Sequence, residues 1–283
     1  MSRIAVIGIV GNSVFLPVER FHIGGETVEA RDIHFELGGK GFNQAVAAAR
    51  YGAEVSFLAA VGEDGYDAIS KFLSKEKISA SLVKKTEKTA FAAIITDTSG
   101  SNRVTVFQGA QLSPADVDCF EEEIRLADIL LINNEVSEAV NERASDLAQK
   151  HGTRIILNPA PARKNSASFN DKIYLFTPNE HETKWIENKS NMIVTLGGEG
   201  CKICDSGLIV PAVRVGKVLD TTGAGDTFNG VLASAIADGC SLPGAAKVAN
   251  IAAGIGVTRR GAVSSIPTKN EINLYEVEKC KSN

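Results

Sequence analysis

The sequence predicts an α/β fold, in which a mostly parallel central β-sheet is covered by helices on both faces. From residue 114 onward, strand patterns and helix patterns alternate, which is typical of parallel strands connected by helices. Residues 3–10 form a nearly continuous apolar run, as expected of a buried strand. Extended segments at about 11–37 and 90–108 interrupt this pattern. We therefore expect a small β-sheet lid on a single domain that spans residues 1–283.

The other elements are assigned from apolar periodicity, with period 2 for strands and 3.6 for helices. The segments 26–30 and 33–37 alternate, so we expect exposed or half-covered strands there. Further strands are expected at 54–61, 91–96, 103–107, 128–132, 153–157, 173–176 and 191–196, with a hairpin-like stretch at 201–215. Helices are expected at 43–50, 66–73, 114–125, 137–150, 226–238, 242–257 and near 269–280.

Composition excludes several classes of function. The net charge of −4 gives no support for binding to nucleic acid or to an anionic membrane. No apolar run approaches the roughly 20 residues that a membrane-spanning helix needs. The chain enters a strand pattern directly after Met1 and shows no signal-peptide cleavage region. We therefore expect a cytoplasmic protein.

The cysteines and histidines give no clear metal or disulfide pattern. The five cysteines are odd in number and scattered, which argues against a disulfide framework. Cys201 and Cys204 have the spacing of a redox or zinc pair, but no second pair accompanies them. They lie in a short strand pattern, where positions three apart face opposite sides. The four histidines show no ligand spacing, so surface or loop positions are favoured for all of them.

A glycine-rich loop at residues 219–228 carries the strongest chemical signal. Apolar residues recur at helical spacing from Phe228 onward, so the loop lies at the N-terminus of a helix. Unpaired N–H groups and the helix dipole favour an anion there. Asp226 stands in the same loop, where its carboxylate could take a proton from a substrate hydroxyl. The pattern fits phosphoryl transfer to an alcohol, although a plain helix cap would also explain it.

Three other stretches have weaker signals. Residues 38–43 are not a Walker sequence, because Lys40 is followed by glycine; its lysine and asparagine suit a polyhydroxylated ligand, or the stretch is a simple turn. Residues 158–163 and 177–182 follow strands, and ligands gather at the carboxyl ends of parallel strands. Asn179 and Glu182 could orient a hydrated Mg²⁺ beside phosphates. Taken alone, these two stretches are also explained by capping.

Together these stretches closely resemble the ribokinase-like family of sugar and nucleoside kinases. The resemblance runs over nearly the whole chain, and the motifs occur in the order typical of that family. They are residues 25–28, 38–48, 158–163, 177–180, 220–228 and 257–261.

The resemblance implies transfer of the γ-phosphoryl group of ATP to a sugar hydroxymethyl group. Asp226 would be the general base, and the anion hole would comprise Gly223, Ala224 and Gly225. The residues that would hold the sugar are Gly39, Lys40, Asn43, Glu135 and, at the position of a family aspartate, Ser13. Those that would line the nucleotide are Asn179, Thr195, Gly197, Gly200 and Asn250.

The resemblance also implies metal ions and an assembly. Glu182 would lie near Mg²⁺ without binding it directly. A monovalent cation, usually K⁺, would be bound by Asp220, Thr222, Gly256, Arg259, Gly261 and Ser265. The lid would also make the contact of a homodimer.

Two departures from the family pattern bear on substrate and nucleotide binding. Ser13 stands where the family has an aspartate that clamps ribose hydroxyls. Losing a charge-assisted hydrogen bond costs roughly 1.5–3 kcal/mol, so a related furanose is favoured over ribose itself. The segment between Glu182 and Asn191 is also short, where the family carries a longer helical segment.

Other functions compete with a sugar kinase. A nucleoside kinase is the nearest alternative, because the altered position 13 could admit a base. A sugar-sensing binder without catalysis would not need both Asp226 and the glycine loop. A dehydrogenase is disfavoured, because residues 8–11 lack the dinucleotide fingerprint.

Overall fold

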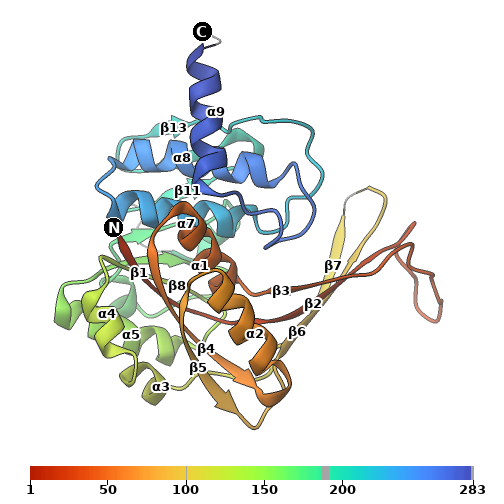
Figure 1. Cartoon of the computed structure of the whole chain (residues 1–283), viewed down its shortest axis with the longest axis horizontal. Coiled ribbons are helices and arrows are strands. Elements are labelled where there is room, and N and C mark those ends of the chain that lie inside the picture. Colours follow the sequence, from red (N-terminus) through yellow and green to blue (C-terminus); the bar gives the residue numbers. More distant parts are fainter. Residues whose placement is uncertain (100, 187–190, 282–283) are drawn as a thin grey trace.

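The computed structural model describes residues 1–99, 101–186 and 191–281, and its centre is a parallel β-sheet (Figure 1). The strand order is β10-β9-β8-β1-β4-β5, and every neighbouring pair is parallel. The strands are β1 (Arg3–Ile7), β4 (Glu54–Gly62), β5 (Ser79–Lys85), β8 (Ile129–Asn133), β9 (Arg154–Asn158) and β10 (Leu175–Phe176). The predicted parallel α/β sheet is confirmed.

Alternation along the central strands divides the interior into two apolar cores. On β1, Ile4 and Val6 belong to one core, and Ala5 and Ile7 to the other, because successive side chains point to opposite faces. The first core is covered by α1 (Lys40–Tyr51), α2 (Glu63–Lys75), α7 (Ala224–Ala237) and α8 (Leu242–Gly256). The second is covered by α3 (Pro114–Asp118), α4 (Glu121–Leu126) and α5 (Glu138–His151). Helices therefore cover both faces, as predicted.

A second sheet forms the predicted lid and projects to one side of the body (Figure 1). Its order is β3-β2-β6-β7, with bounds β2 (Gly11–Pro17), β3 (His34–Gly38), β6 (Ala90–Thr96) and β7 (Asn102–Phe107). Only residues 8–10 separate β1 from β2, and Gly39 alone separates β3 from α1. The lid is therefore attached directly to the end of the central sheet at which its strands have their carboxyl termini.

The remaining elements complete the C-terminal half. A small antiparallel sheet has the order β11-β12-β13, with β11 (Ile193–Thr195), β12 (Cys201–Ile203) and β13 (Leu208–Val210). The short helices are α6 (Ala167–Asn170), η1 (Glu182–Trp185) and η2 (Gly197–Glu199), and the C-terminal helix is α9 (Lys269–Lys281). Among the described residues, no helix is long and apolar enough to cross a bilayer.

Several sequence-based boundaries are wrong. Residues 26–30 do not form a strand, since only Ala30 makes a bridge, to Val18, and most of the segment is exposed. The helix expected at 114–125 is two helices, because the chain turns at Cys119 and Phe120. The strand expected at 173–176 is reduced to β10, and the hairpin expected to reach 215 ends at Val210.

One strand was missing from the sequence-based assignment. β5 lies at the edge of the central sheet, and its residues are exposed or half-buried. Its two lysines and two serines interrupt the apolar pattern that identifies the buried strands. An edge position tolerates such polar residues, so the composition of β5 reflects its place in the sheet.

Close backbone packing fixes where α1 begins. A Cβ atom on Gly8, just after β1, would lie 2.6 Å from the Cα of Gly41 in the first turn of α1. Gly39, the residue before α1, has φ 116° and would place a Cβ 2.3 Å from the carbonyl oxygen of Ile9. Only glycine permits this approach. The start of α1 is therefore held against the carboxyl end of β1.

A second close contact joins α1 to α7. A Cβ on Gly230 of α7 would lie 2.3 Å from the carbonyl oxygen of Gln44 on α1. This missing side chain lets the two helices approach closely, so polar residues near their N-termini come within hydrogen-bond distance.

Candidate active site

The glycine loop turns sharply into α7, as the sequence predicted. Gly223 precedes the helix with φ 74°, a left-handed conformation that favours glycine. The N–H of Thr227 donates to the carbonyl of Gly223 at 2.8 Å, which begins the helical hydrogen bonding. The N–H groups of the first turn have no partner inside the helix, as at every helix start, although the N–H of Ala224 donates to the carbonyl of Thr221 before it at 3.2 Å. Gly223, Ala224 and Gly225 thus lie where backbone N–H groups can receive an anion.

Asp226 is 7% exposed and lies in the first turn of α7. Its two carboxylate oxygens accept hydrogen bonds from two neighbouring residues of α1. The amide nitrogen Nδ2 of Asn43 donates at 2.9 Å, and Nε2 of Gln44 donates at 3.1 Å. Because an ionised carboxylate only accepts, these bonds fix the orientation of both amides and of the carboxylate.

Gln44 extends this network to the central sheet. Its side chain is fully buried, and Nε2 also donates to Oδ1 of Asn158 at 3.2 Å. Nδ2 of Asn158 donates in turn to the carbonyl of Thr177 at 3.0 Å. Asp226 is therefore connected to the ends of β9 and β10. Gln44 is not among the predicted site residues; the one hint in the sequence is an amide on a helix otherwise rich in small residues, and it does not point to a partner.

Lys40 and Glu135 lie beside this carboxylate. The backbone N–H of Lys40 donates to Oε2 of Glu135 at 2.7 Å, and the N–H of Glu135 donates to Oδ1 of Asn133 at 2.9 Å. The Asp226 carboxylate raises the pKa of Lys40 above its usual value, with Glu135 and Glu182 adding to the effect against burial. The structure thus brings Lys40, Asn43, Glu135 and Asp226 together, with Gly39 adjoining.

Burial has a marked effect on Glu135. It raises the pKa of the Glu135 carboxyl to about 7, because the charged form is poorly solvated; Lys40 opposes the shift and Asp226 adds to it. Glu135 is thus a group whose protonation changes close to neutral pH.

Ser13 is the one predicted sugar residue that comes from the lid. It is 8% exposed in β2 and pairs with Glu36 of β3. The Glu36 carboxylate reaches the body of the protein at Ala262. Since paired residues share a face of the sheet, Ser13 also lies on the face turned toward the body.

The predicted nucleotide residues form one group on the C-terminal side. Asn179 makes an isolated bridge to Thr195, and Thr195 pairs with Cys201. Gly200 lies against the chain at Val210, where a Cβ would meet the carbonyl oxygen at 2.2 Å. Nδ2 of Asn250 donates to the same Val210 carbonyl at 3.0 Å. Gly197 has φ 54° and open space where a side chain would lie.

Asn179 and Glu182 bond to each other rather than projecting separately. The backbone N–H of Asn179 donates to one Glu182 oxygen at 2.8 Å, and its Nδ2 donates to the other at 2.9 Å. Oδ1 of Asn179 accepts from the N–H groups of His181 and Glu182. The Asn179 side chain thus caps this turn. The short segment between Glu182 and Asn191 that departs from the family pattern lies partly outside the described residues.

The predicted cation residues lie on two loops joined by Asp220. One Asp220 oxygen accepts from the N–H of Thr222 at 2.9 Å, and the other accepts from the N–H of Gly261 at 3.0 Å. Ser265 is 2% exposed, and its hydroxyl donates to the carbonyl of Ala262 at 2.8 Å. The N–H of Arg259 donates to the carbonyl of Gly256 at 2.9 Å. The structure therefore brings the predicted cation residues together beside the glycine loop.

The cysteine pair has no matching metal arrangement. Cys201 is buried, and burial raises the pKa of its thiol to about 11, which keeps it protonated at neutral pH. Within the described residues, no group of three or more His, Cys, Asp or Glu side chains is arranged to hold a metal ion.

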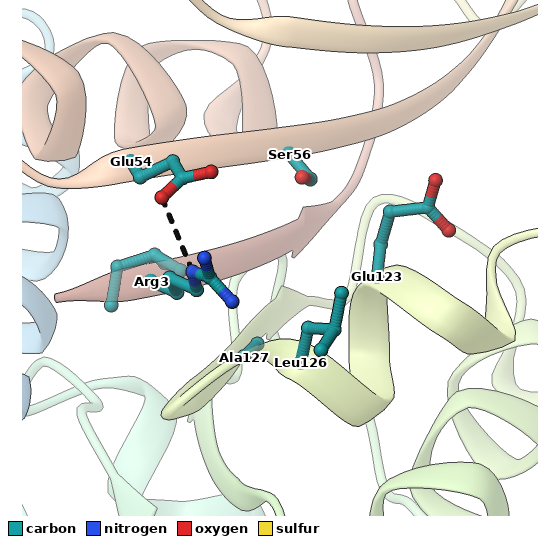
Figure 2. Close-up of a pocket in the computed structure, with 7 residues that line it drawn as sticks. Arg3, Glu54, Ser56, Glu123, Leu126 and Ala127 are labelled. Carbon is teal, nitrogen blue, oxygen red and sulfur yellow. Dashed lines mark hydrogen bonds and ion pairs between the residues drawn. The ribbon is translucent and has the colours of Figure 1, made fainter.

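A separate pocket lies at the amino edge of the central sheet, away from the groups above (Figure 2). Its volume is about 110 Å³, and its lining includes Arg3 and Glu54, whose side chains pair at 3.2 Å. Both side chains are about half exposed to solvent. Arg3 begins β1, whereas Asp226 and its partners lie near the opposite end of that strand. None of the predicted site residues lines this pocket.

Known proteins resemble the chain over nearly its whole length. The family described as pfkB family carbohydrate kinase matches residues 1–269. A ribokinase of Bacillus subtilis is 34% identical, covering 96% of this chain and 98% of the relative. A deoxyribokinase of Salmonella typhi is 33% identical, with coverages of 96% and 98%. The crystal structure of a Thermotoga maritima ribokinase has a TM-score of 0.86 at 30% identity, covering 97% and 99%. The expected ribokinase-like fold is confirmed.

The raised pKa of Glu135 predicts a pH-dependent stability. The folded protein holds the proton more tightly than the unfolded chain, whose carboxyl has a pKa near 4.5. The stabilising contribution is therefore fully present below pH 4.5 and is lost as the pH rises through about 7. Urea denaturation at several pH values should show wild type losing stability relative to Glu135→Gln over this range. The exposed control Glu29→Gln should give a stability-versus-pH curve parallel to that of wild type. A parallel curve for Glu135→Gln as well would contradict the predicted pH dependence.

Proposed function

The chain belongs to the pfkB family of carbohydrate kinases, and we propose that its acceptor is the hydroxymethyl group of a pentose or related furanose. It is an ATP-dependent sugar kinase, and ribokinases and deoxyribokinases align with nearly its whole length. One observation carries the proposed mechanism: a buried carboxylate, oriented by two amides, lies in the first turn of a glycine-preceded helix.

Asp226 acts as the general base. Its carboxylate accepts the proton of the sugar hydroxymethyl group as that oxygen bonds to the γ-phosphorus of ATP. The bond from the γ-phosphorus to the oxygen it shares with the β-phosphate breaks, which yields ADP and a sugar phosphate. The proton leaves Asp226 to solvent afterwards. The N–H groups of Gly223, Ala224 and Gly225 stabilise the charge on the transferred phosphoryl oxygens.

The sugar is held by groups that surround this carboxylate. Lys40 and Asn43 donate hydrogen bonds to sugar hydroxyls, Glu135 accepts them, and the backbone at Gly39 lies alongside. Asn43 also bonds to Asp226 at 2.9 Å. A sugar bound to Asn43 is therefore placed beside the base, which reduces the entropy lost on reaching the reactive geometry.

Ser13 shifts the preference away from ribose. A serine hydroxyl makes single neutral hydrogen bonds, whereas the aspartate expected there would make charge-assisted ones. A related furanose that needs no charge-assisted hydrogen bond from position 13 is therefore favoured. A nucleoside acceptor is the alternative, and the same assay distinguishes it.

ATP and its Mg²⁺ occupy the side formed by Asn179, Thr195, Gly197, Gly200 and Asn250. Both Glu182 oxygens already accept N–H groups from Asn179, which fits contact with the hydration shell of the ion better than direct binding. Bound Mg²⁺ would neutralise charge on the phosphates.

The oxygen-rich loops that Asp220 joins suit a monovalent cation, which we expect to be K⁺. Asp220, Thr222, Gly256, Arg259, Gly261 and Ser265 would hold it through carbonyl and side-chain oxygens. Because Asp220 bonds to Thr222 and to Gly261, an ion there would order the loop that leads into α7.

The exposed residues on one face of the lid favour a homodimer. On the face opposite Ser13 and Glu36, Phe35, Phe91 and Phe107 are 65%, 39% and 54% exposed. Exposed aromatic clusters of this kind mark protein interfaces. A hollow of about 410 Å³ beside Phe35 and Phe91 offers room for a partner's side chain. We place the enzyme in the cytoplasm, where ATP is supplied.

Replacing the base tests the mechanism. Asp226→Asn should lower kcat by at least about 10²-fold, because an amide cannot take the proton. ATP affinity, measured by calorimetry, should stay near that of wild type. The matched control is Asp238→Asn, which removes an exposed carboxylate just after the same helix and should leave kcat unchanged. A near-normal kcat for Asp226→Asn would show that another group is the base.

Position 13 tests the substrate preference. Ser13→Asp should lower the KM for ribose about tenfold, because a charge-assisted hydrogen bond becomes available. Ser13→Ala serves as a control and should bring no gain. The new carboxylate would lie opposite Glu36, and two like charges there could destabilise the lid. Circular dichroism should therefore be used to check that Ser13→Asp is folded. A KM for ribose that is unchanged or higher in a folded Ser13→Asp variant would contradict this account of specificity.

A further inference from the structure

Glu36 is a lid carboxylate that reaches across to the body of the protein. It lies in β3, and its side chain is 9% exposed. One of its oxygens accepts from the N–H of Ala262 at 2.5 Å. The other accepts from the N–H of Ser264 at 3.3 Å; the Ser264 hydroxyl lies 3.2 Å away, but its single proton is shared with the carbonyl of Arg260 at 2.9 Å. A lid residue is thus bonded to a loop 226 residues away in sequence.

The loop that Glu36 contacts supports the proposed anion hole. A Cβ on Gly223 would lie 3.1 Å from the Cα of Ala262, so the two backbones are in contact. Gly261, the residue before Ala262, donates its N–H to Asp220, which in turn holds Thr222. Contacts therefore run without a gap from the lid, through Glu36, to the residues just before Asp226.

The loop is shaped to receive a carboxylate. Gly261 has φ 88°, and a Cβ there would lie 2.8 Å from one Glu36 oxygen. After this left-handed glycine, the N–H groups of Ala262 and Ser264 both donate to the Glu36 carboxylate, whereas the N–H of Gly261 itself donates to Asp220. Backbone N–H groups gathered in such a turn bind anions. The ring nitrogen Nε2 of His34, two residues earlier on β3, lies 3.9 Å from a Glu36 oxygen, and the His34 side chain is 54% exposed.

Glu36 also stands opposite Ser13, the lid residue at the proposed sugar site. The two side chains share one face of the lid, so whatever holds Glu36 also holds Ser13 in place over the body. An aspartate at position 13 would face this carboxylate, and like charges directly opposite each other are destabilising. The presence of Glu36 is thus consistent with a neutral residue at position 13.

We propose that Glu36 is a positioning residue that couples the lid to the anion-hole loop. When its carboxylate is bonded to Ala262 and Ser264, the lid and the loop before Asp226 move as one unit. Ser13 is then held over the sugar while the N–H groups of residues 223–225 are held for the phosphoryl group. Glu36 itself touches neither substrate. The inference rests on the proposed sugar kinase function.

The test replaces the carboxylate by its amide. In Glu36→Gln, the amide NH₂ would face an N–H donor, so at least one of the bonds to Ala262 and Ser264 is lost. We expect the KM for the sugar to rise about tenfold and kcat to fall severalfold, with ATP affinity unchanged. Glu29→Gln makes the same charge change at an exposed site in the lid connection and should behave as wild type.

Hydrogen exchange separates this inference from the proposed function. In Glu36→Gln, amide exchange should rise at least tenfold both in β3 and at residues 222–226, whether or not a substrate has been identified. Exchange that rises at Ala262 and Ser264 alone would overturn the coupling, since the contact would then be local. A Glu36→Gln variant that only melts at lower temperature, with KM and kcat as in Glu29→Gln, would also overturn it. A wild type without sugar kinase activity would refute the proposed function but leave the exchange result decisive for the coupling.

Discussion

The bonds from α1 to the Asp226 carboxylate are the interaction on which the site depends. Asn43 and Gln44 fix both carboxylate oxygens, and Gln44 connects them to the end of the central sheet. These bonds require α1 and α7 to lie unusually close, which Gly230 permits. Burying a carboxylate costs free energy unless hydrogen bonds compensate for the lost hydration, and here the two amides supply such bonds. In the proposed mechanism, this carboxylate meets the acceptor hydroxyl at the start of a helix that receives the phosphoryl group.

The lid and the C-terminal loops add what this centre lacks. Ser13 brings a hydroxyl from the lid, while Asp220 joins the two loops next to the proposed anion hole. Glu36 links these two parts through its bonds to Ala262 and Ser264. The candidate site is therefore assembled from segments far apart in sequence, and under the proposed coupling a change in the lid would reach the phosphoryl side without touching either substrate.

Local signals explain which features the sequence predicts well. The parallel sheet follows from strand–helix alternation, and the turn into α7 follows from its glycines and the apolar repeat after Asp226. Long-range contacts explain what it misses. Gln44 and Glu36 act on partners 182 and 226 residues away, and no local pattern reveals such pairs. β5 escapes detection because an edge strand need not be apolar, and residues 26–30 alternate without a neighbouring strand to pair with.

The most direct test of the central claim is ADP release with Mg-ATP and K⁺ across a panel of acceptors. The panel should contain ribose, deoxyribose, other pentoses, fructose and nucleosides, with ATP alone as the blank. The account predicts turnover that depends on a pentose or related furanose, and a product phosphorylated on its hydroxymethyl group. Turnover with nucleosides alone, or none with any acceptor although ATP binds, would contradict it.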